Sequence, residues 1–138
     1  MKRNVPVTTI MATHPSTVHP GQRLSDARQA MVDGGFHHLP VVRGTKLIGV
    51  LSSTDLLKAA YTFGTDPRQS DAVMDHTLSI EQLMTKEPVF LRSSDPIRSA
   101  VEKFAEGRFH ALPVVDADDN LVGVVTTTDV MRYVLEQY

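Results

Sequence analysis

Two short stretches of the chain combine hydroxyl and carboxylate side chains in the same order, Gly-Val-Leu-Ser-Ser-Thr-Asp and Gly-Val-Val-Thr-Thr-Thr-Asp. In the first, Ser52 precedes Asp55 by three residues, and in the second, Thr126 precedes Asp129 by the same spacing. Each stretch follows an apolar run typical of a strand and precedes a pattern typical of a helix, whose first N–H groups lack intrahelical partners. The simplest interpretation is therefore a helix cap, with Ser or Thr as the acceptor and an acidic first turn that suits the helix dipole.

A ligand site can use the same arrangement. Hydroxyl groups and free N–H groups at a helix N-terminus bind phosphate. A carboxylate there would repel phosphate, but it can accept hydrogen bonds from two neighbouring hydroxyls, such as the 2′ and 3′ hydroxyls of a ribose. The opening glycine, Gly49 or Gly123, would let the backbone pass close to a flat group. Together these features describe a nucleotide site, and both interpretations remain open at this point.

The two stretches belong to a longer internal repeat. Met11 aligns with Met84 at an offset of 73 residues, and the segment Leu-Pro-Val-Val recurs at that offset. Asp55 aligns with Asp129 at an offset of 74, so the second copy has gained one residue between Leu-Pro-Val-Val and the glycine. A register kept over about fifty positions indicates two tandem units, which we expect to pack together because one such unit would bury only a small core.

Each copy predicts the element order β-α-β-β-α. The extended segments are Ser16–Val18 and Val89–Leu91, and the first helices end at Gly34-Gly35 and at Gly107. The first helix follows Pro20 and Gly21 in one copy and Asp95, the expected N-cap, in the other. The hairpin turns are Arg43–Lys46 and Asp116–Asn120, and the last helices are Asp55–Tyr61 and Asp129–Glu136. Short helices are also predicted at Thr8–Met11 and at Ser79–Met84, the latter leading into the second copy.

The motif Gly-h-h-[Ser/Thr]-x-x-Asp, where h is apolar, following h-Pro-Val-Val in such a unit, resembles the cystathionine-β-synthase-type (CBS) domain, and the tandem arrangement resembles a CBS pair, or Bateman module. The resemblance covers Ile10–Tyr61 and Leu83–Tyr138. It implies an α+β (α/β-like) fold of two tandem βαββα repeats packed as a pseudo-two-fold pair. The expected domains are 8–62 and 80–138, joined by a linker over 63–79.

The resemblance also implies roles for individual residues. It assigns Asp55 and Asp129 to the ribose hydroxyls, Ser52 and Thr126 to the phosphate, His37 and His110 to the neighbourhood of the phosphates, and Thr17, Val18, Val89 and Phe90 to the border of the base. The alternative for the two histidines is that they are ordinary, partly buried side chains. Arg108, directly before Phe109 and His110, is a further candidate phosphate neighbour; the alternative is a solvated arginine. Its counterpart in the first copy is Gly35, so we expect the two clefts to differ in their affinity for anions.

The function that follows is a stand-alone regulatory module that binds an adenine nucleotide, AMP, ADP, ATP or S-adenosylmethionine, in clefts between the repeats. The nucleotide would be a regulatory ligand, and no cofactor is required. The resemblance implies a homodimer formed through helices, and we expect the signal to pass to an unknown protein effector in trans. The alternative is a non-catalytic interaction or scaffold protein with vestigial clefts.

Other classes of function are disfavoured by composition and motifs. The net charge is −2 with no basic stripe, which argues against nucleic-acid binding. The six histidines form no metal-ligand spacing and there is no Cys, so we expect no metal. No catalytic triad, P-loop or dinucleotide fingerprint is found, so we expect no enzyme.

The same evidence bears on location. No apolar run reaches the roughly 20 residues of a membrane span, and no secretory signal is recognisable at the N-terminus. We therefore expect no membrane insertion and a cytoplasmic location.

Overall fold

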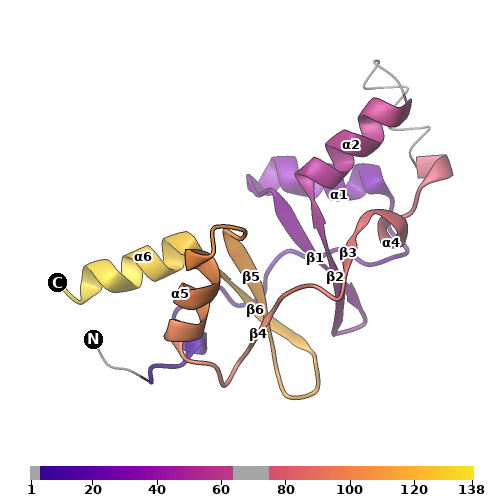
Figure 1. Cartoon of the computed structure of the whole chain (residues 1–138). Coiled ribbons are helices and arrows are strands. Elements are labelled where there is room, and N and C mark those ends of the chain that lie inside the picture. Colours follow the sequence, from indigo (N-terminus) through magenta and orange to yellow (C-terminus); the bar gives the residue numbers. More distant parts are fainter. Residues whose placement is uncertain (1–3, 64–74) are drawn as a thin grey trace. The chain divides into compact units, whose positions relative to one another are not determined.

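A computed structural model of the chain describes residues 4–63 and 75–138, which form two compact units (Figure 1). Unit 2 is the continuous stretch Ser16–Pro88. Unit 1 is discontinuous and combines Met1–Pro15 with Val89–Tyr138. Most of the linker predicted over 63–79 lies outside the described residues.

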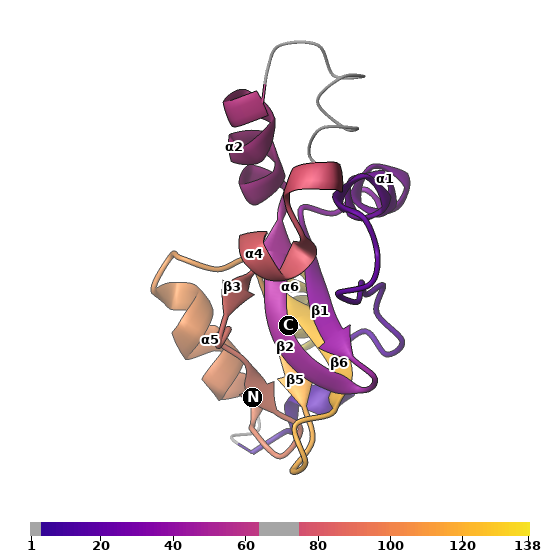
Figure 2. The same ribbon diagram turned by 90° about the vertical axis from the view of Figure 1, so that its right-hand side faces the viewer.

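Unit 2 contains the first sequence repeat. Its elements are α1 (Leu24–Gly34), β1 (His38–Arg43), β2 (Lys46–Ser52), α2 (Ser53–Phe63), α4 (Ile80–Leu83) and β3 (Thr85–Lys86). The strands form an antiparallel sheet in the order β1-β2-β3, and Val18 adds a parallel bridge to Val41 on the free side of β1. In Figure 2, α4 leads directly into β3, which lies beside β2.

The core of unit 2 follows from the period of its apolar residues. Leu24, Ala27 and Met31 recur at helical spacing on α1 and are buried. The helix stops where predicted, because Gly35 takes a left-handed conformation with φ of 69°. Ile80 from α4 is fully buried in the same core.

Unit 1 contains the second repeat and is built in the same way. Its elements are η1 (Val7–Thr9), β4 (Leu91–Arg92), α5 (Ile97–Ala105), β5 (Ala111–Val115), β6 (Leu121–Thr126) and α6 (Thr127–Glu136). β4 pairs in parallel with β5, and β5 pairs antiparallel with β6. The element order predicted for the second repeat is therefore confirmed; in the first repeat it is confirmed except that the initial strand is reduced to a single bridge at Val18.

One predicted cap is wrong. The N-cap of α5 is Pro96 rather than Asp95. Asp95 uses its carboxylate one turn earlier, where it accepts a hydrogen bond of 2.8 Å from the Arg92 N–H. This bond closes the turn that leads into the helix, and the N-cap of α5 has no side-chain hydrogen bond.

The segment that precedes each repeat completes the other unit. Ala12 forms two backbone hydrogen bonds with Val124 of β6, of 2.9 and 3.0 Å, so the N-terminal segment joins the second repeat. Thr85 pairs with Val50 of β2, so the segment before the second repeat joins the first. The helix predicted near residues 79–84 is therefore present, but it packs in unit 2 instead of leading into its own repeat.

We call these two segments the exchanged segments, because each joins the unit of the other repeat. Their close approach explains why positions 49 and 123 are glycines. A Cβ placed on Gly49 would lie 2.5 Å from the Met84 sulfur and 2.9 Å from the Thr85 carbonyl oxygen. A Cβ on Gly123 would lie 2.5 Å from the Met11 sulfur. The interpretation that these glycines admit a flat group is wrong, because within each unit the close neighbour is the exchanged segment.

The chain passes between the units at equivalent points of the repeat. His14 and Glu87, which are 73 residues apart, have φ values of 54° and 50°. Each precedes a proline, Pro15 or Pro88, and the unit boundary follows that proline. Left-handed backbone is uncommon for residues other than glycine, so both crossings use the same special conformation.

Candidate functional site

The hydroxyl–carboxylate pairs form reciprocal helix caps in both units. In unit 2, Ser52 Oγ accepts a hydrogen bond of 3.0 Å from the Asp55 N–H, and Asp55 Oδ2 accepts one of 2.9 Å from the Ser52 N–H. In unit 1, the corresponding bonds between Thr126 and Asp129 are 3.1 and 2.8 Å. This is a capping box, with the acidic residue at the third helical position. The capping interpretation is confirmed for both stretches.

The caps leave part of each carboxylate unused. In each cap the aspartate uses its backbone N–H and its Oδ2. No residue in 4–63 or 75–138 donates a hydrogen bond to Oδ1 of Asp55 or Asp129. Both side chains are half-buried. A carboxylate oxygen with two acceptor lone pairs is therefore held in a fixed direction at the start of α2 and of α6.

Each helix start also leaves a backbone donor unused. The first N–H of α2, from Ser53, bonds the His37 carbonyl oxygen at 2.8 Å, and the third, from Asp55, bonds Ser52. Within the described part of the chain, the second N–H, from Thr54, has no acceptor. Thr54 is exposed, so its N–H and hydroxyl are both free to meet an anion.

The same donor is found in unit 1, where Thr128 occupies the second position of α6 and is also exposed. The sequence prediction assigned the phosphate to Ser52 and Thr126 and missed Thr54 and Thr128. Their place in the middle of the Ser-Thr-Asp and Thr-Thr-Asp runs was the available signal.

The predicted histidines lie next to these helix starts. The His110 carbonyl oxygen accepts a hydrogen bond of 2.9 Å from Thr127, as His37 does from Ser53. Both histidines are exposed. Three of the predicted residues of each unit, a histidine, a hydroxyl and an aspartate, are thus brought together at one helix N-terminus.

The residues predicted to border the base have different surroundings. Val18 is 2% exposed, and both its N–H and its C=O bond the backbone of β1, at Pro40 and Val42. Thr17 is exposed. Only Thr17 of this pair presents a side chain to the surface.

The pair predicted for the second repeat, Val89 and Phe90, is shifted by one residue from the structural counterparts of Thr17 and Val18. Val18 pairs with Val41 and Leu91 pairs with Val114, so Leu91 is the counterpart of Val18. The predicted residues Val89 and Phe90 lie one position earlier; Val89 is exposed and Phe90 is half-buried. The constant offset of 73 residues was sufficient to find Leu91.

Arg108 lies close to an acidic side chain. Its guanidinium is 2.9 Å from Glu106 and 5.1 Å from the centre of the Phe109 ring, and its side chain is 67% exposed. An exposed pair of this kind contributes little stability. Arg108 therefore remains able to exchange its partner for another anion.

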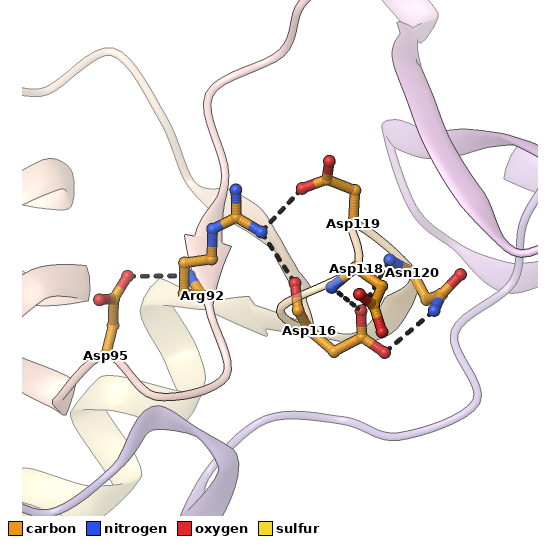
Figure 3. A network of polar contacts seen from close by, with 6 residues as sticks. All are labelled: Arg92, Asp95, Asp116, Asp118, Asp119 and Asn120. Atoms are coloured by element: carbon orange, nitrogen blue, oxygen red, sulfur yellow. Dashed lines mark hydrogen bonds and ion pairs between the residues drawn. The ribbon is translucent and has the colours of Figure 1, made fainter.

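A second arginine contacts a predicted site residue. The Arg92 guanidinium lies 5.1 Å from the Phe90 ring centre and also bonds the Asp116 carbonyl oxygen at 2.8 Å and Asp119 Oδ1 at 2.7 Å (Figure 3). In the same figure the Asp116 carboxylate accepts bonds from the backbone N–H groups of Asp118 and Asn120. Arg92 thus joins β4 to the turn between β5 and β6.

Metal-ligand clusters and membrane-spanning helices are both absent from the described residues. No group of three or more His, Cys, Asp or Glu side chains in residues 4–63 and 75–138 could hold a metal ion. The helices of these same residues include none that has both the length and the apolar character needed to cross a bilayer.

A family model for the CBS domain matches residues 7–62 and 80–136. The chain belongs to the CBS-domain family. Among curated relatives, the uncharacterized protein MJ1225 of Methanocaldococcus jannaschii is 32% identical over 116 residues, which cover 83% of this chain and 41% of that protein. CBSX2, a chloroplastic CBS domain-containing protein of Arabidopsis thaliana, is 28% identical over 86% of this chain and 58% of its own length.

A homoserine O-acetyltransferase of Methanohalobium evestigatum is 32% identical over 94% of this chain, but the match covers 24% of that protein. This CBS pair therefore spans less than two thirds of each of these three curated relatives. These relatives are longer than this chain, and the name homoserine O-acetyltransferase belongs to the whole of that relative, not to the part that matches.

Solved CBS-pair structures share the fold. CBSX2 in complex with AMP matches with a TM-score of 0.80 and 29% identity, over 96% of this chain and 98% of that one. The CBS domain pair of MJ0100, in complex with 5′-methylthioadenosine and S-adenosyl-L-methionine, matches with a TM-score of 0.75 and 25% identity, over 94% and 99%. The α+β fold with two CBS repeats is thereby confirmed.

Proposed function

We propose that this chain is a regulatory, non-catalytic CBS pair that binds an adenine nucleotide at the helix starts of α2 and α6 and passes the signal to a protein partner. The observation that carries the proposal is the repeated helix start, where an oriented Oδ1, a free backbone N–H and a neighbouring histidine lie together. CBS pairs of 25% and 29% identity bind adenosine compounds. The ligand class is thus AMP, ADP, ATP or S-adenosylmethionine.

The proposed roles follow from the free atoms. Asp55 Oδ1, or Asp129 Oδ1 in the other unit, accepts hydrogen bonds from the ribose hydroxyls. The N–H of Thr54 or Thr128 donates to a phosphate or another anionic group, where the helix dipole adds attraction. The carboxylate keeps its cap through Oδ2, so binding does not require the helix to lose its N-cap.

One observation favours the alternative of an interaction or scaffold protein. Both caps are complete without any ligand, so the residues of the motif have a structural role of their own. A binding experiment that preserves the caps separates the two proposals.

The experiment is a thermal-shift panel with the four nucleotides on the full chain. A ligand at 100 times its Kd stabilises the folded state by about 2.7 kcal/mol. In the double variant Asp55→Asn, Asp129→Asn the amide oxygen can still accept the capping bond, but the charge is lost. Because a hydrogen bond to a charged group contributes about 1.5–3 kcal/mol, we expect nucleotide affinity to fall about tenfold or more.

Asp26→Asn is the matched control. Asp26 is the capping-box residue of α1, where its Oδ2 accepts a bond of 3.0 Å from the Arg23 N–H, and it belongs to no predicted site. Nucleotide affinity should be unchanged in this variant. If none of the four nucleotides stabilises the wild type, or if Asp26→Asn weakens binding as much as the double variant, the scaffold proposal is preferred.

We also propose that the chain forms a homodimer through α2 and α6. Leu57 and Tyr61 on α2 are 58% and 82% exposed, and their repeat counterparts Met131 and Leu135 on α6 are 60% and 74% exposed. Both repeats therefore present the same apolar face, and in an isologous dimer each copy would contribute that face to the interface.

Sedimentation of Leu57→Glu and Met131→Glu tests this interface. We expect each variant to be a monomer at concentrations where the wild type is a dimer, because a charge would be buried without a partner. Lys58→Glu, at an exposed position of the same helix, is the comparison. Dimers of unchanged affinity in both apolar variants would place the interface elsewhere.

A further inference from the structure

Met11 and Met84 occupy the same position in the two units. They are equivalent in the repeat, and each places its sulfur directly over a glycine of the neighbouring strand, Met11 over Gly123 and Met84 over Gly49. An added Cβ on either glycine would lie 2.5 Å from the sulfur, so the thioether rests against the glycine backbone with no space between them. Both methionines also pack against the hydrophobic core of their unit.

The strands that these methionines anchor are very short. β3 contains two residues, and its counterpart in unit 1 is a single bridge at Ala12, with two hydrogen bonds to Val124. A strand with so few ladder hydrogen bonds opens easily, because local stability follows from buried apolar contacts and protected hydrogen bonds. The methionine side chain is therefore the apolar contact nearest to these ladder bonds, in addition to the buried Val7 and Ile80 of the same segments.

Both side chains are half-buried, whereas Met31 in the core of unit 2 is 4% exposed. A small oxidant can reach a half-buried sulfur. A peroxide transfers one oxygen atom to a thioether: the O–O bond breaks, the sulfur is oxidised by two electrons to the sulfoxide, and hydrogen peroxide is reduced to water. The product is larger and strongly polar.

We propose that Met11 and Met84 are paired oxidation sites, and that their conversion to methionine sulfoxide releases the exchanged strand from each unit. On the side of the sulfur that faces Gly49 or Gly123 an added oxygen has no room, and a polar sulfoxide loses its favourable contact with the apolar core. The modification is reversible by methionine sulfoxide reductases. This site is distinct from the helix starts proposed to bind nucleotide.

The test uses the full chain treated with hydrogen peroxide. Mass spectrometry follows sulfoxide formation at each methionine, and NMR follows hydrogen exchange of the Ala12 and Val124 amides in unit 1 and of Val50 and Thr85 in unit 2. We expect exchange at these amides to accelerate by about tenfold or more as the sulfoxide forms at Met11 and Met84, and to recover after reductase treatment.

The chain supplies its own controls. Met31, which is 4% exposed, should oxidise more slowly than Met11 and Met84. The variant Met11→Leu, Met84→Leu keeps the side-chain volume but cannot be oxidised, so its exchange rates should not respond to peroxide.

Two results would overturn the proposal. One is full sulfoxide formation at both sites with unchanged amide exchange in the wild type, a measurement that needs no variant. The other is an equal response to peroxide in the Met11→Leu, Met84→Leu variant.

Discussion

At the scale of the residue, the structure rests on side chains that perform two tasks at once. Asp55 caps α2 through one oxygen, and within the described residues the other accepts no hydrogen bond; Asp129 does the same on α6. The three-residue spacing predicts the cap, because it follows from backbone geometry alone. The sequence cannot predict which oxygen remains free, since this depends on the side-chain torsion and on the neighbouring strand.

Gly123 offers a prediction at this scale. In Gly123→Ala the new Cβ would lie 2.5 Å from the Met11 sulfur and 2.8 Å from the Ala12 carbonyl oxygen, and backbone atoms cannot move away easily. We expect a loss of about 1–3 kcal/mol in the free energy of unfolding, the usual effect of overpacking. Urea unfolding followed by circular dichroism measures it.

Gly21→Ala is the control for the same chemical change. Its Cβ would meet only the His19 ring at 3.2 Å, in an exposed loop where the side chain can turn away. Stability should change little. If Gly123→Ala loses no more stability than Gly21→Ala, the contact between Gly123 and the segment of Met11 and Ala12 tolerates a methyl group.

At the scale of the element, periodicity predicts the helices and hairpin strands but not the shortest strands. β2 has seven residues and α1 has eleven, long enough to show a period of two or of 3.6. β3 has two residues and the bridge at Ala12 has one, so neither contains a period. Their positions are fixed by pairing partners that are distant in the sequence.

The turn between β5 and β6 gives a prediction for an element held by one side chain. Arg92→Ala removes the hydrogen bond to the Asp116 carbonyl oxygen, the ion pair with Asp119 and the contact with Phe90. The side chain is 41% exposed, so solvent weakens the ion pair, and we expect unfolding free energy to fall by about 1 kcal/mol. Chemical denaturation measures the change.

Arg98→Ala is the comparison within the same unit. Arg98 forms an exposed ion pair with Glu102 one turn along α5, and both side chains are mostly in solvent. Its removal should change stability by about 0.5 kcal/mol or less. If the two variants lose the same amount, the bridge from β4 to the turn has no stabilising role.

At the scale of the whole molecule, repeats and compact units divide the chain differently. Val7 from the first segment is buried in the core of unit 1, and its counterpart Ile80 is buried in the core of unit 2. The repeat makes the two segments equivalent, so sequence alone cannot decide which unit each one joins. The ranges 8–62 and 80–138 remain a prediction of domains.

The exchange predicts how isolated fragments behave. Fragment 16–88 contains all of unit 2, so we expect it to fold cooperatively by itself. Fragment 8–62 follows the sequence repeat but lacks Ile80, Met84 and β3, and losing a buried Ile contact alone costs about 2–5 kcal/mol. We therefore expect it to be unfolded. Amide NMR spectra distinguish the two outcomes, and a well-dispersed spectrum from 8–62 would contradict the assignment of unit 2.

The discontinuity of unit 1 also sets an order of events during synthesis. Residues 5–12 are synthesised long before their partners Ile97 and Val124. At about 5–20 residues per second, the segment waits several seconds, while unit 2 can already close once Lys86 has emerged. The second repeat therefore matures after the first, and anything that holds residues 5–12 during synthesis, such as a chaperone, delays the folding of the second repeat.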